Sequence, residues 1–251
     1  MSQLPFGEIR NALGERLDYS CEGGAEPGQD LLVVIGHGVT ANKDRPWALT
    51  LARALERAGI ASLRFSFSGN GESEGDFRQS TVSKEVADLG SVLDAVLSTG
   101  ERPICFVGHS MAGAVGVLRA AQDERIGFLV SLAGMVETQA FAQRKFGELI
   151  PGQDVMWDKP ECPLATNFVE DMRAIGSVLP QAAQVKVPWL LIHGTADGVI
   201  PVAEAQAAAA AAPDPERVEV VVFEGADHLF SGEHEARMAA RVCDWVRASS
   251  A

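Results

Sequence analysis

The amino-acid sequence predicts an α/β fold, in which a mostly parallel, twisted sheet is covered by helices on both faces. Two observations lead to this prediction. Short apolar runs that do not alternate with polar residues, such as residues 31–35, are typical of strands buried on both faces. These runs alternate along the chain with longer segments of helical periodicity, and that alternation is typical of a parallel sheet.

The individual elements follow from the same two patterns. Pro46 suits a first helical turn, the next apolar residues share one helical face, and Gly59 ends the helix. Strands are expected at residues 31–35, 60–65, 103–107, 128–132, 189–192 and 218–223. Helices are expected at residues 46–58, 82–97, 111–121, 202–212 and 233–247. Residues 8–12 and 17–21 break the rhythm, and they predict an antiparallel hairpin at the sheet edge.

Residues 134–187 contain no strand signal and a broken helical pattern. A loop of this length is seldom structureless in a compact domain and is often a functional lid. We therefore expect one domain over residues 1–251, with a small helical cap inserted at about 134–187. The cap should cover the active site, and Trp157 is expected to form a wall of the substrate pocket because its neighbours restrain the backbone.

Charge and cysteine spacing argue against several classes of partner. The chain has 21 basic and 34 acidic residues and a formal net charge of -13, which repels nucleic acid and anionic membrane surfaces. The four cysteines have no metal-ligand spacing, so neither a metal nor another cofactor is expected. The N-terminus does not resemble a secretory signal, and no apolar segment approaches the roughly 20 residues that span a bilayer. These features predict a cytoplasmic monomer or homodimer that acts on a small molecule.

Ser110 is the first residue for which the sequence predicts chemistry. The sequence Gly108-His109-Ser110-Met111-Ala112-Gly113 lies between an expected strand and an expected helix. A serine on a strained strand-to-helix turn is a nucleophile elbow, which lifts the hydroxyl out of the sheet. The usual pattern is G-x-S-x-G, and Ala112 is the smallest replacement for its last glycine. The alternative is that Ser110 only caps the helix.

A serine hydroxyl needs an adjacent base, and the base needs an orienting acid. His228 lies in GADHLF, directly after the last expected strand, where the chain returns to an elbow serine. Asp197 lies in HGTADGVIP after the preceding strand, and it is the expected acid. Asp227 adjoins the base and is therefore badly placed to hold its ring. His37 is expected to pack or hydrogen-bond around the substrate pocket.

The reaction also needs backbone donors for the negative charge that develops on the substrate oxygen. One is the N–H of Met111, which follows the nucleophile. The second is expected in the loop after the first parallel strand, where we favour the N–H of Val39 over that of Thr40. Gly38 should allow this backbone to approach the oxyanion.

These residues resemble the α/β-hydrolase superfamily, and within it the bacterial cinnamoyl and feruloyl esterases and the serine-aminopeptidase-like hydrolases. Four segments carry the resemblance: GHGVTANKDRPW, LRFSFSGNGESEGDF, VGHSMAG, and IHGTADGVIP with FEGADHLF. It implies an α/β-hydrolase fold and the same roles for Ser110, Asp197, His228 and the Val39 and Met111 amides. The chain departs from the pattern at Val39, where a bulky aromatic residue is usual, and at Met111, which is often Gln.

The resemblance and the residues together predict a carboxylesterase that cleaves small or medium acyl esters through an acyl-serine intermediate. The only tyrosine, Tyr19, lies far from the cap in sequence, which argues against a phenolic substrate. The same triad also serves amidases, peptidases, thioesterases and carbon–carbon hydrolases, because a fold does not determine a function. A ligand-binding protein on a hydrolase scaffold is an alternative from a different class.

Overall fold

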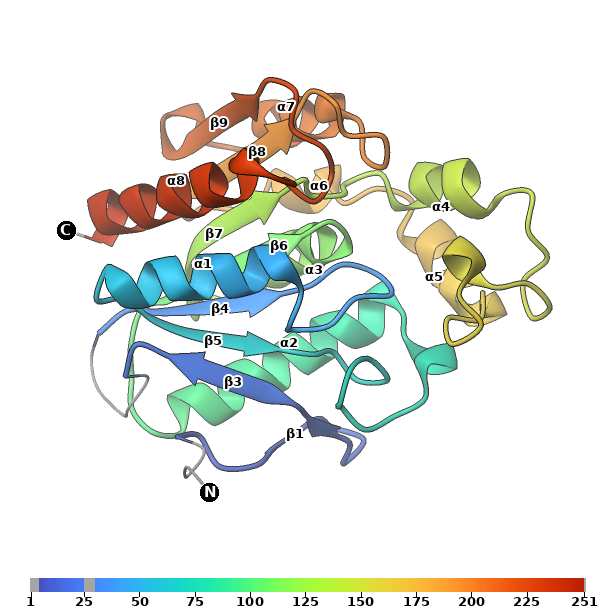
Figure 1. Ribbon diagram of the computed structural model, residues 1–251, viewed down its shortest axis with the longest axis horizontal. Helices are drawn as coiled ribbons and strands as arrows, with labels where there is room; N and C mark the ends of the chain where they lie inside the picture. The colour runs from blue at the N-terminus through green and yellow to red at the C-terminus, as the bar shows by residue number, and fades with distance from the viewer. Residues whose placement is uncertain (1–4, 25–29, 251) are drawn as a thin grey trace.

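A seven-stranded sheet runs through the centre of the protein in a computed structural model, which describes residues 5–24 and 30–250 (Figure 1). Every neighbouring pair of strands is parallel except the first, which is antiparallel. In spatial order the strands are β3 (Tyr19–Glu22), β5 (Ala61–Phe65), β4 (Leu32–Gly36), β6 (Ile104–His109), β7 (Ile126–Leu132), β8 (Trp189–Gly194) and β9 (Val218–Phe223). The mostly parallel α/β fold expected from the sequence is confirmed.

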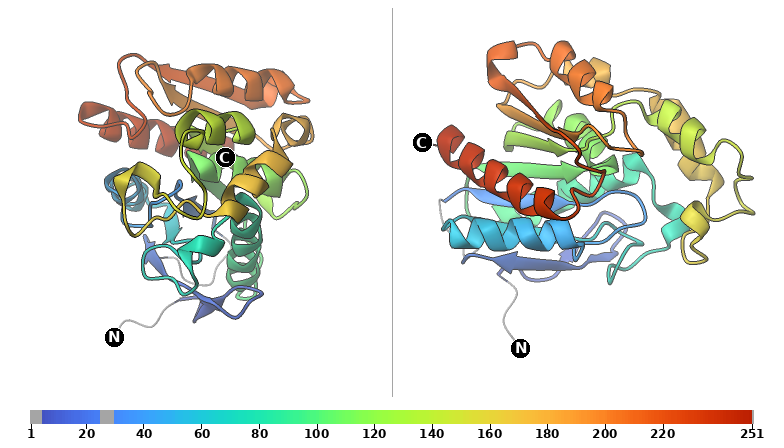
Figure 2. Two further views of the ribbon diagram at one scale, coloured as in Figure 1. Left: turned by 90° about the vertical axis from the view of Figure 1, so that its right-hand side faces the viewer. Right: turned by 45° about the horizontal axis from the view of Figure 1, so that its top comes forward.

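Helices cover both faces of this sheet, as the views in Figures 1 and 2 show. Two helices pack together over one face: α1 (Pro46–Arg57) and α8 (Glu233–Ser250). The other face is covered by α2 (Val82–Leu97), α3 (Met111–Ala120) and α7 (Val202–Ala211). Two short 3₁₀ helices, η1 (Phe77–Gln79) and η3 (Pro215–Arg217), lie in connections.

The strands are continuous apolar runs because both of their faces are buried. In β4, Val33 and Ile35 belong to the core under α1 and α8, whereas Leu32 and Val34 belong to the core on the opposite face. Successive side chains of a strand point to opposite faces of the sheet. Both faces are covered, so every position of the strand is apolar and buried.

The hairpin near the N-terminus differs from the one expected at residues 8–12 and 17–21. A short hairpin does form, between β1 (Ile9–Arg10) and β2 (Arg16–Leu17), but it is a separate two-stranded sheet. The chain then leaves this hairpin, and β3 pairs antiparallel with β5 at the edge of the main sheet. Residues 19–22 pair with β5 and not with residues 8–12, because the edge of β5 offers a row of unpaired backbone N–H and C=O groups.

The connection between β7 and β8 projects beyond the carboxyl ends of the strands (Figure 2). It contains α4 (Thr138–Phe146), η2 (Met156–Asp158), α5 (Thr166–Ile175) and α6 (Leu179–Ala182). Phe146 packs against Phe168 with ring centroids 6.1 Å apart, and both rings are buried. This segment therefore has an apolar interior of its own, next to the sheet edge where ligands of open α/β sheets bind.

Candidate active site

Ser110 occupies a sharp turn between the end of β6 and the start of α3. Its backbone has φ 56° and ψ -118°, a conformation that non-glycine residues rarely adopt. Its amide nitrogen donates to the carbonyl of Leu132 at 3.0 Å, and its carbonyl accepts from Met135 at 3.0 Å. The surrounding backbone thus holds Ser110 in a strained conformation, and strain of this kind is concentrated at functional sites.

Gly108 and Gly113 make this turn possible, whereas position 112, the last of the G-x-S-x-G pattern, does not need a glycine. A Cβ atom at Gly108 would lie 2.2 Å from the carbonyl oxygen of Ala112. A Cβ atom at Gly113 would lie 2.6 Å from the Cα of Gly134, at the end of β7. Ala112 itself is fully buried within the core. The close backbone approach therefore occurs one residue later than in G-x-S-x-G, which explains why alanine fits at position 112.

The loop after β4 passes directly beside Ser110. A Cβ atom at Gly38 would lie 2.8 Å from the Cβ of Ser110, so only glycine allows this approach. His37 orients the loop: its Nδ1 donates to the carbonyl of Gly38 at 2.9 Å, and its Nε2 accepts from the amide of Phe67 at 3.1 Å. The carbonyl of Gly38 and the N–H of Val39 belong to one peptide plane, so the first hydrogen bond also sets the direction of that N–H.

His228 and Asp197 come from the loops after β9 and β8, and they are joined by a hydrogen bond. The Nδ1 of His228 lies 2.8 Å from Oδ2 of Asp197. The other carboxylate oxygen accepts from the amides of Val199 at 2.7 Å and Ile200 at 2.9 Å. The carboxylate is therefore fixed by the backbone, and it leaves Nε2 of His228 as the free ring nitrogen.

His193, at the end of β8, is a second imidazole on the same carboxylate. Its Nε2 lies 3.2 Å from Oδ2 of Asp197 and 2.9 Å from the carbonyl of Ile200. Burial by itself would raise the pKa of Asp197, but the hydrogen bonds from His193 and His228 outweigh it. The pKa of Asp197 is consequently held well below its ordinary value, and the residue stays ionised at neutral pH.

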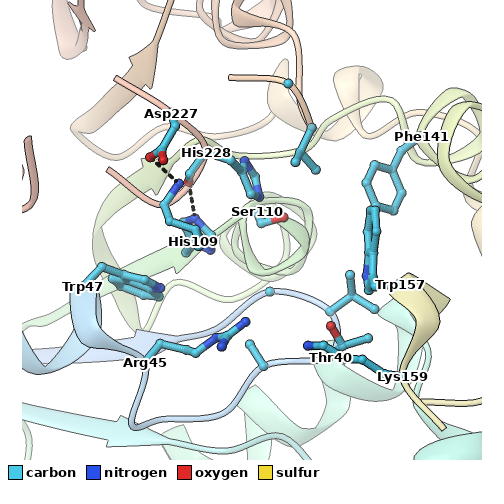
Figure 3. Close-up of a pocket in the computed structure, with 16 residues that line it drawn as sticks. Thr40, Arg45, Trp47, His109, Ser110, Phe141, Trp157, Lys159, Asp227 and His228 are labelled. Atoms are coloured by element: carbon cyan, nitrogen blue, oxygen red, sulfur yellow. Dashed lines mark hydrogen bonds between the residues drawn. The ribbon is translucent and has the colours of Figure 1, made fainter. Parts of the chain in front are cut away.

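His109 supports His228 from below. Its Nε2 lies 2.8 Å from the backbone carbonyl of His228 (Figure 3), and its ring lies between those of Trp47 and His228, with centroids 4.8 Å from each. Burial, together with the nearby charge of His228, lowers the pKa of His109 to about 3. His109 is therefore neutral, and Nε2 is the protonated nitrogen that donates to this carbonyl.

Ser110 and His228 face one pocket of about 380 Å³, which lies between the sheet edge and the β7–β8 connection (Figure 3). Phe141 and Trp157 stand on the side of that connection, and Trp157 packs edge-on against Phe146. The hydroxyl of Ser110 and the ring of His228 make no hydrogen bond to each other in this structure. Such bonds often tighten only when substrate binds.

The structure brings together most of the residues that the sequence singled out. Ser110, His228, Val39 and Trp157 all line this pocket. Asp197 is held against His228 just outside it. His37 does not line the pocket and acts through the Gly38 carbonyl instead. Met111 is buried at the start of α3, directly after Ser110.

Several other residues line the pocket, and the sequence did not predict a role for their side chains. These are Thr40, Arg45, Trp47, His109 and Lys159. Thr40 has φ 57°, which is unusual for a β-branched residue and is invisible in a sequence. The only available signal was the position of four of these residues within two segments already tied to the site, residues 36–47 and 107–113.

Two neutral, buried histidines predict a loss of stability in mild acid. Burial lowers the pKa of His37 to about 4 and that of His109 to about 3, against about 6.5 in an unfolded chain. The unfolded state therefore binds these protons first, and stability should fall as the pH decreases from about 6.5 toward 4. Each imidazole should contribute up to about 1.4 kcal/mol per pH unit.

Urea unfolding between pH 7 and pH 5 tests this expectation. The slope of unfolding free energy against pH should be smaller in His37→Gln and in His109→Gln than in the parent, by up to one proton's contribution for each substitution. Slopes unchanged in both variants would contradict the assignment of neutral imidazoles.

The fold and the turn at Ser110 define a class of protein, the α/β hydrolases. Residues 32–241 match the model of the Alpha/beta hydrolase family, and the chain belongs to that family. The resemblance to this superfamily noted in the sequence is thereby confirmed.

Curated relatives include enzymes of ester and thioester hydrolysis. The mitochondrial palmitoyl-protein thioesterase ABHD10 of Bos taurus is 25% identical over 241 residues, which cover 91% of this chain and 75% of the relative. Protein phosphatase methylesterase 1 of Mus musculus is 30% identical over 120 residues, or 46% of this chain and 29% of the relative. Both are proteins to which this chain is similar, and the second match is confined to about half of the chain.

Solved structures share the fold over nearly the whole chain. Est1E from Butyrivibrio proteoclasticus with bound ferulic acid superposes with a TM-score of 0.84 at 23% identity, covering 96% of this chain and 98% of that one. Mouse ABHD10 superposes with a TM-score of 0.76 at 19% identity, with the same coverage. Within residues 5–24 and 30–250, no helix is long and apolar enough to cross a membrane.

Proposed function

We propose that this protein is a serine hydrolase that cleaves esters of small or medium acyl groups. One observation carries the proposal. A serine held at φ 56° faces the same pocket as a histidine whose Nδ1 is bound to a buried, ionised carboxylate. An activated serine needs a base that is itself oriented by a third group, and this arrangement supplies both.

In the proposed reaction, Nε2 of His228 takes the proton of Ser110 as its Oγ bonds to the ester carbonyl carbon. The positive charge that forms on His228 is stabilised by Asp197. His228 then gives its proton to the departing alcohol, and the carbon–oxygen bond of the ester breaks, leaving an acyl-serine. Water, deprotonated by the same ring, hydrolyses the acyl-serine and regenerates the free hydroxyl.

The amides of Val39 and Met111 are proposed to hold the oxyanion in both steps. They lie on the two segments that meet at Ser110, and neither donates to a carbonyl in the described loops. Met111 is the first residue of α3, so its N–H has no partner within the helix. One such donor typically contributes about 10² to 10³ to turnover.

Thioester hydrolysis is the second candidate, and the relatives named as palmitoyl-protein thioesterases favour it. The same acyl-serine forms from an ester or a thioester, and only the leaving group differs. The pocket of about 380 Å³ and the partly exposed Trp157 beside it fit a short acyl chain better than an extended one. We therefore place ester hydrolysis first.

Labelling with a fluorophosphonate tests the proposal directly. The native protein should react with one equivalent, and mass spectrometry should find the adduct on the peptide that contains Ser110. Protein unfolded in urea should not react, because activation depends on the folded site. If the native protein stayed unlabelled and hydrolysed neither p-nitrophenyl acetate nor an acyl thioester, it would be a binding protein on a hydrolase scaffold.

A further inference from the structure

Two cationic side chains line the pocket of Ser110, and neither has an acidic partner in the part of the chain that the structure describes. Arg45 precedes α1, and Lys159 follows η2. Within the described ranges, neither side chain forms an ion pair or a hydrogen bond. In a chain with 34 acidic residues and a net charge of -13, unpaired cations at one pocket call for a physical explanation.

The acidic residues closest in sequence either accept other hydrogen bonds or are exposed on the surface. Asp44 accepts hydrogen bonds from Arg64 and Lys43. Asp227 lines the same pocket, but one of its oxygens accepts the amides of Leu229 and Ser231. Asp158 and Glu161, which are close to Lys159 in sequence, are exposed on the surface. The two cations thus keep their charge available for a ligand.

The two charges act on one common neighbour, the buried thiol of Cys162. Burial raises the pKa of the Cys162 thiol, and both Lys159 and Arg45 oppose that rise. Burial lowers the pKa of His109, and the charge of Arg45 lowers it further. Arg45 is therefore within electrostatic range both of the base's neighbour and of the wall that carries Lys159.

Figure 3 shows how the two side chains approach the reacting serine. Arg45 enters the pocket from the side of Trp47, and Lys159 enters from the side of Trp157. Their charged ends point toward each other below Ser110 in this view. The hydroxyl of Thr40 lies beside Lys159, and it makes no hydrogen bond to any described residue.

We propose that Arg45 and Lys159 form a subsite for a carboxylate on the substrate, so that the protein prefers esters that carry a second, free carboxylate. The inference rests on the proposed ester hydrolysis. A guanidinium offers parallel N–H donors that match a planar carboxylate, and an ammonium adds a second charge. The Thr40 hydroxyl is placed to donate a further hydrogen bond. Because one compact pocket holds both the cations and Ser110, the substrate should be a small monoester of a dicarboxylic acid or an ester of a small hydroxy acid.

Two pairs of matched esters test the subsite. The first pair compares mono-p-nitrophenyl glutarate with p-nitrophenyl hexanoate and places the carboxylate on the acyl side. The second compares the butyrate esters of p-hydroxybenzoate and of methyl p-hydroxybenzoate and places it on the alcohol side. In at least one pair, kcat/KM should be about tenfold or more higher for the anionic ester, the scale of one hydrogen bond between charged groups.

Variants then assign the preference to the two cations. Arg45→Gln and Lys159→Gln should each reduce the ratio of anionic to neutral kcat/KM by about ten- to a hundredfold, and Arg45→Lys should restore part of it. Arg53→Gln is the matched control, because it removes the same charge from an exposed position of α1 and should leave the ratio unchanged. Both esters are measured on the same preparation, so the ratio of their kcat/KM values does not depend on the fraction of protein that is active.

Two results would overturn the subsite. One is hydrolysis of the neutral esters with no preference for either anionic partner. The other is a preference that survives both Gln substitutions or that falls equally in Arg53→Gln, which would trace it to the overall charge. Failure to hydrolyse any ester would instead contradict the proposed function, so the two failures are distinguishable.

Discussion

Ser110→Ala should lower the turnover of p-nitrophenyl acetate by a factor on the order of 10⁶, to the residual rate that binding and the oxyanion donors provide. The substitution removes the oxygen atom that is proposed to form the acyl intermediate. Thr40 also lines the pocket and has a positive φ, but it lies in the loop after β4 and not on a strand-to-helix turn. Fluorophosphonate labelling should disappear together with the turnover. Activity above a few per cent of the parent would show that Ser110 is not the nucleophile.

The protein should remain folded after this change. The backbone hydrogen bonds of residue 110 to Leu132, Met135 and Gly113 do not involve the hydroxyl, and alanine carries the same Cβ in the same strained conformation. Thermal unfolding of the parent and of Ser110→Ala should therefore agree within a few degrees. A large fall in the midpoint of thermal unfolding would show that the serine hydroxyl also stabilises the fold, which the hydrogen bonds of residue 110 do not indicate.

A second substitution at His228 makes the test more stringent. His228→Ala alone should cost nearly as much turnover as Ser110→Ala, and the double variant should be hardly worse than either, because the two residues act as one unit. Losses that multiply in the double variant would place His228 outside the catalytic unit, even though its ring faces the same pocket as the serine.

The fold and the nucleophile turn could be predicted because both depend on residues that are close together in the sequence. The strand ending at His109, the turn at Ser110 and the helix that follows occupy one short segment. Asp197 and His228 could be found because each directly follows a buried strand, and the carboxyl ends of parallel strands meet at one edge. Each of these inferences needed only a local pattern and a topological rule.

The N-terminal hairpin and the cations of the pocket could not be predicted from local patterns. The first depends on which strand edge residues 19–22 pair with, and the second on contacts between residues far apart in the sequence. Residues 19–22 prefer the free edge of β5 to a longer hairpin, and only the assembled sheet presents that edge. Arg45 and Lys159 are far apart in sequence, and the β7–β8 connection brings them to one pocket. Only the folded protein shows that neither cation has an acidic partner among the described residues.

Asp197→Asn should reduce turnover by roughly 10⁴ while leaving the pocket intact. The carboxylate holds the proton of His228 on Nδ1 through the 2.8 Å hydrogen bond, and this leaves Nε2 free to accept the serine's proton. In the variant, the oxygen of the amide remains the best partner for the amides of Val199 and Ile200. The amide NH₂ then faces Nδ1 of His228 and donates to it. The ring is forced into the tautomer that carries its proton on Nε2, which cannot act as the base.

Asp227→Asn provides the matched control, since Asp227 is adjacent to His228 and lines the same pocket. Its side chain accepts the amides of Leu229 and Ser231, and an asparagine oxygen can accept both. We therefore expect this variant to change kcat by less than tenfold, and pre-steady-state acylation by p-nitrophenyl acetate should separate the two variants most clearly. His193 adds to the difference between the two variants. Its Nε2, which is hydrogen-bonded to the carbonyl of Ile200, lies 3.2 Å from the same oxygen of Asp197, and only Asp197→Asn replaces that oxygen with an amide NH₂. A larger loss in Asp227→Asn than in Asp197→Asn would mean that Asp227 orients His228, and it would contradict the assignment of Asp197 as the acid.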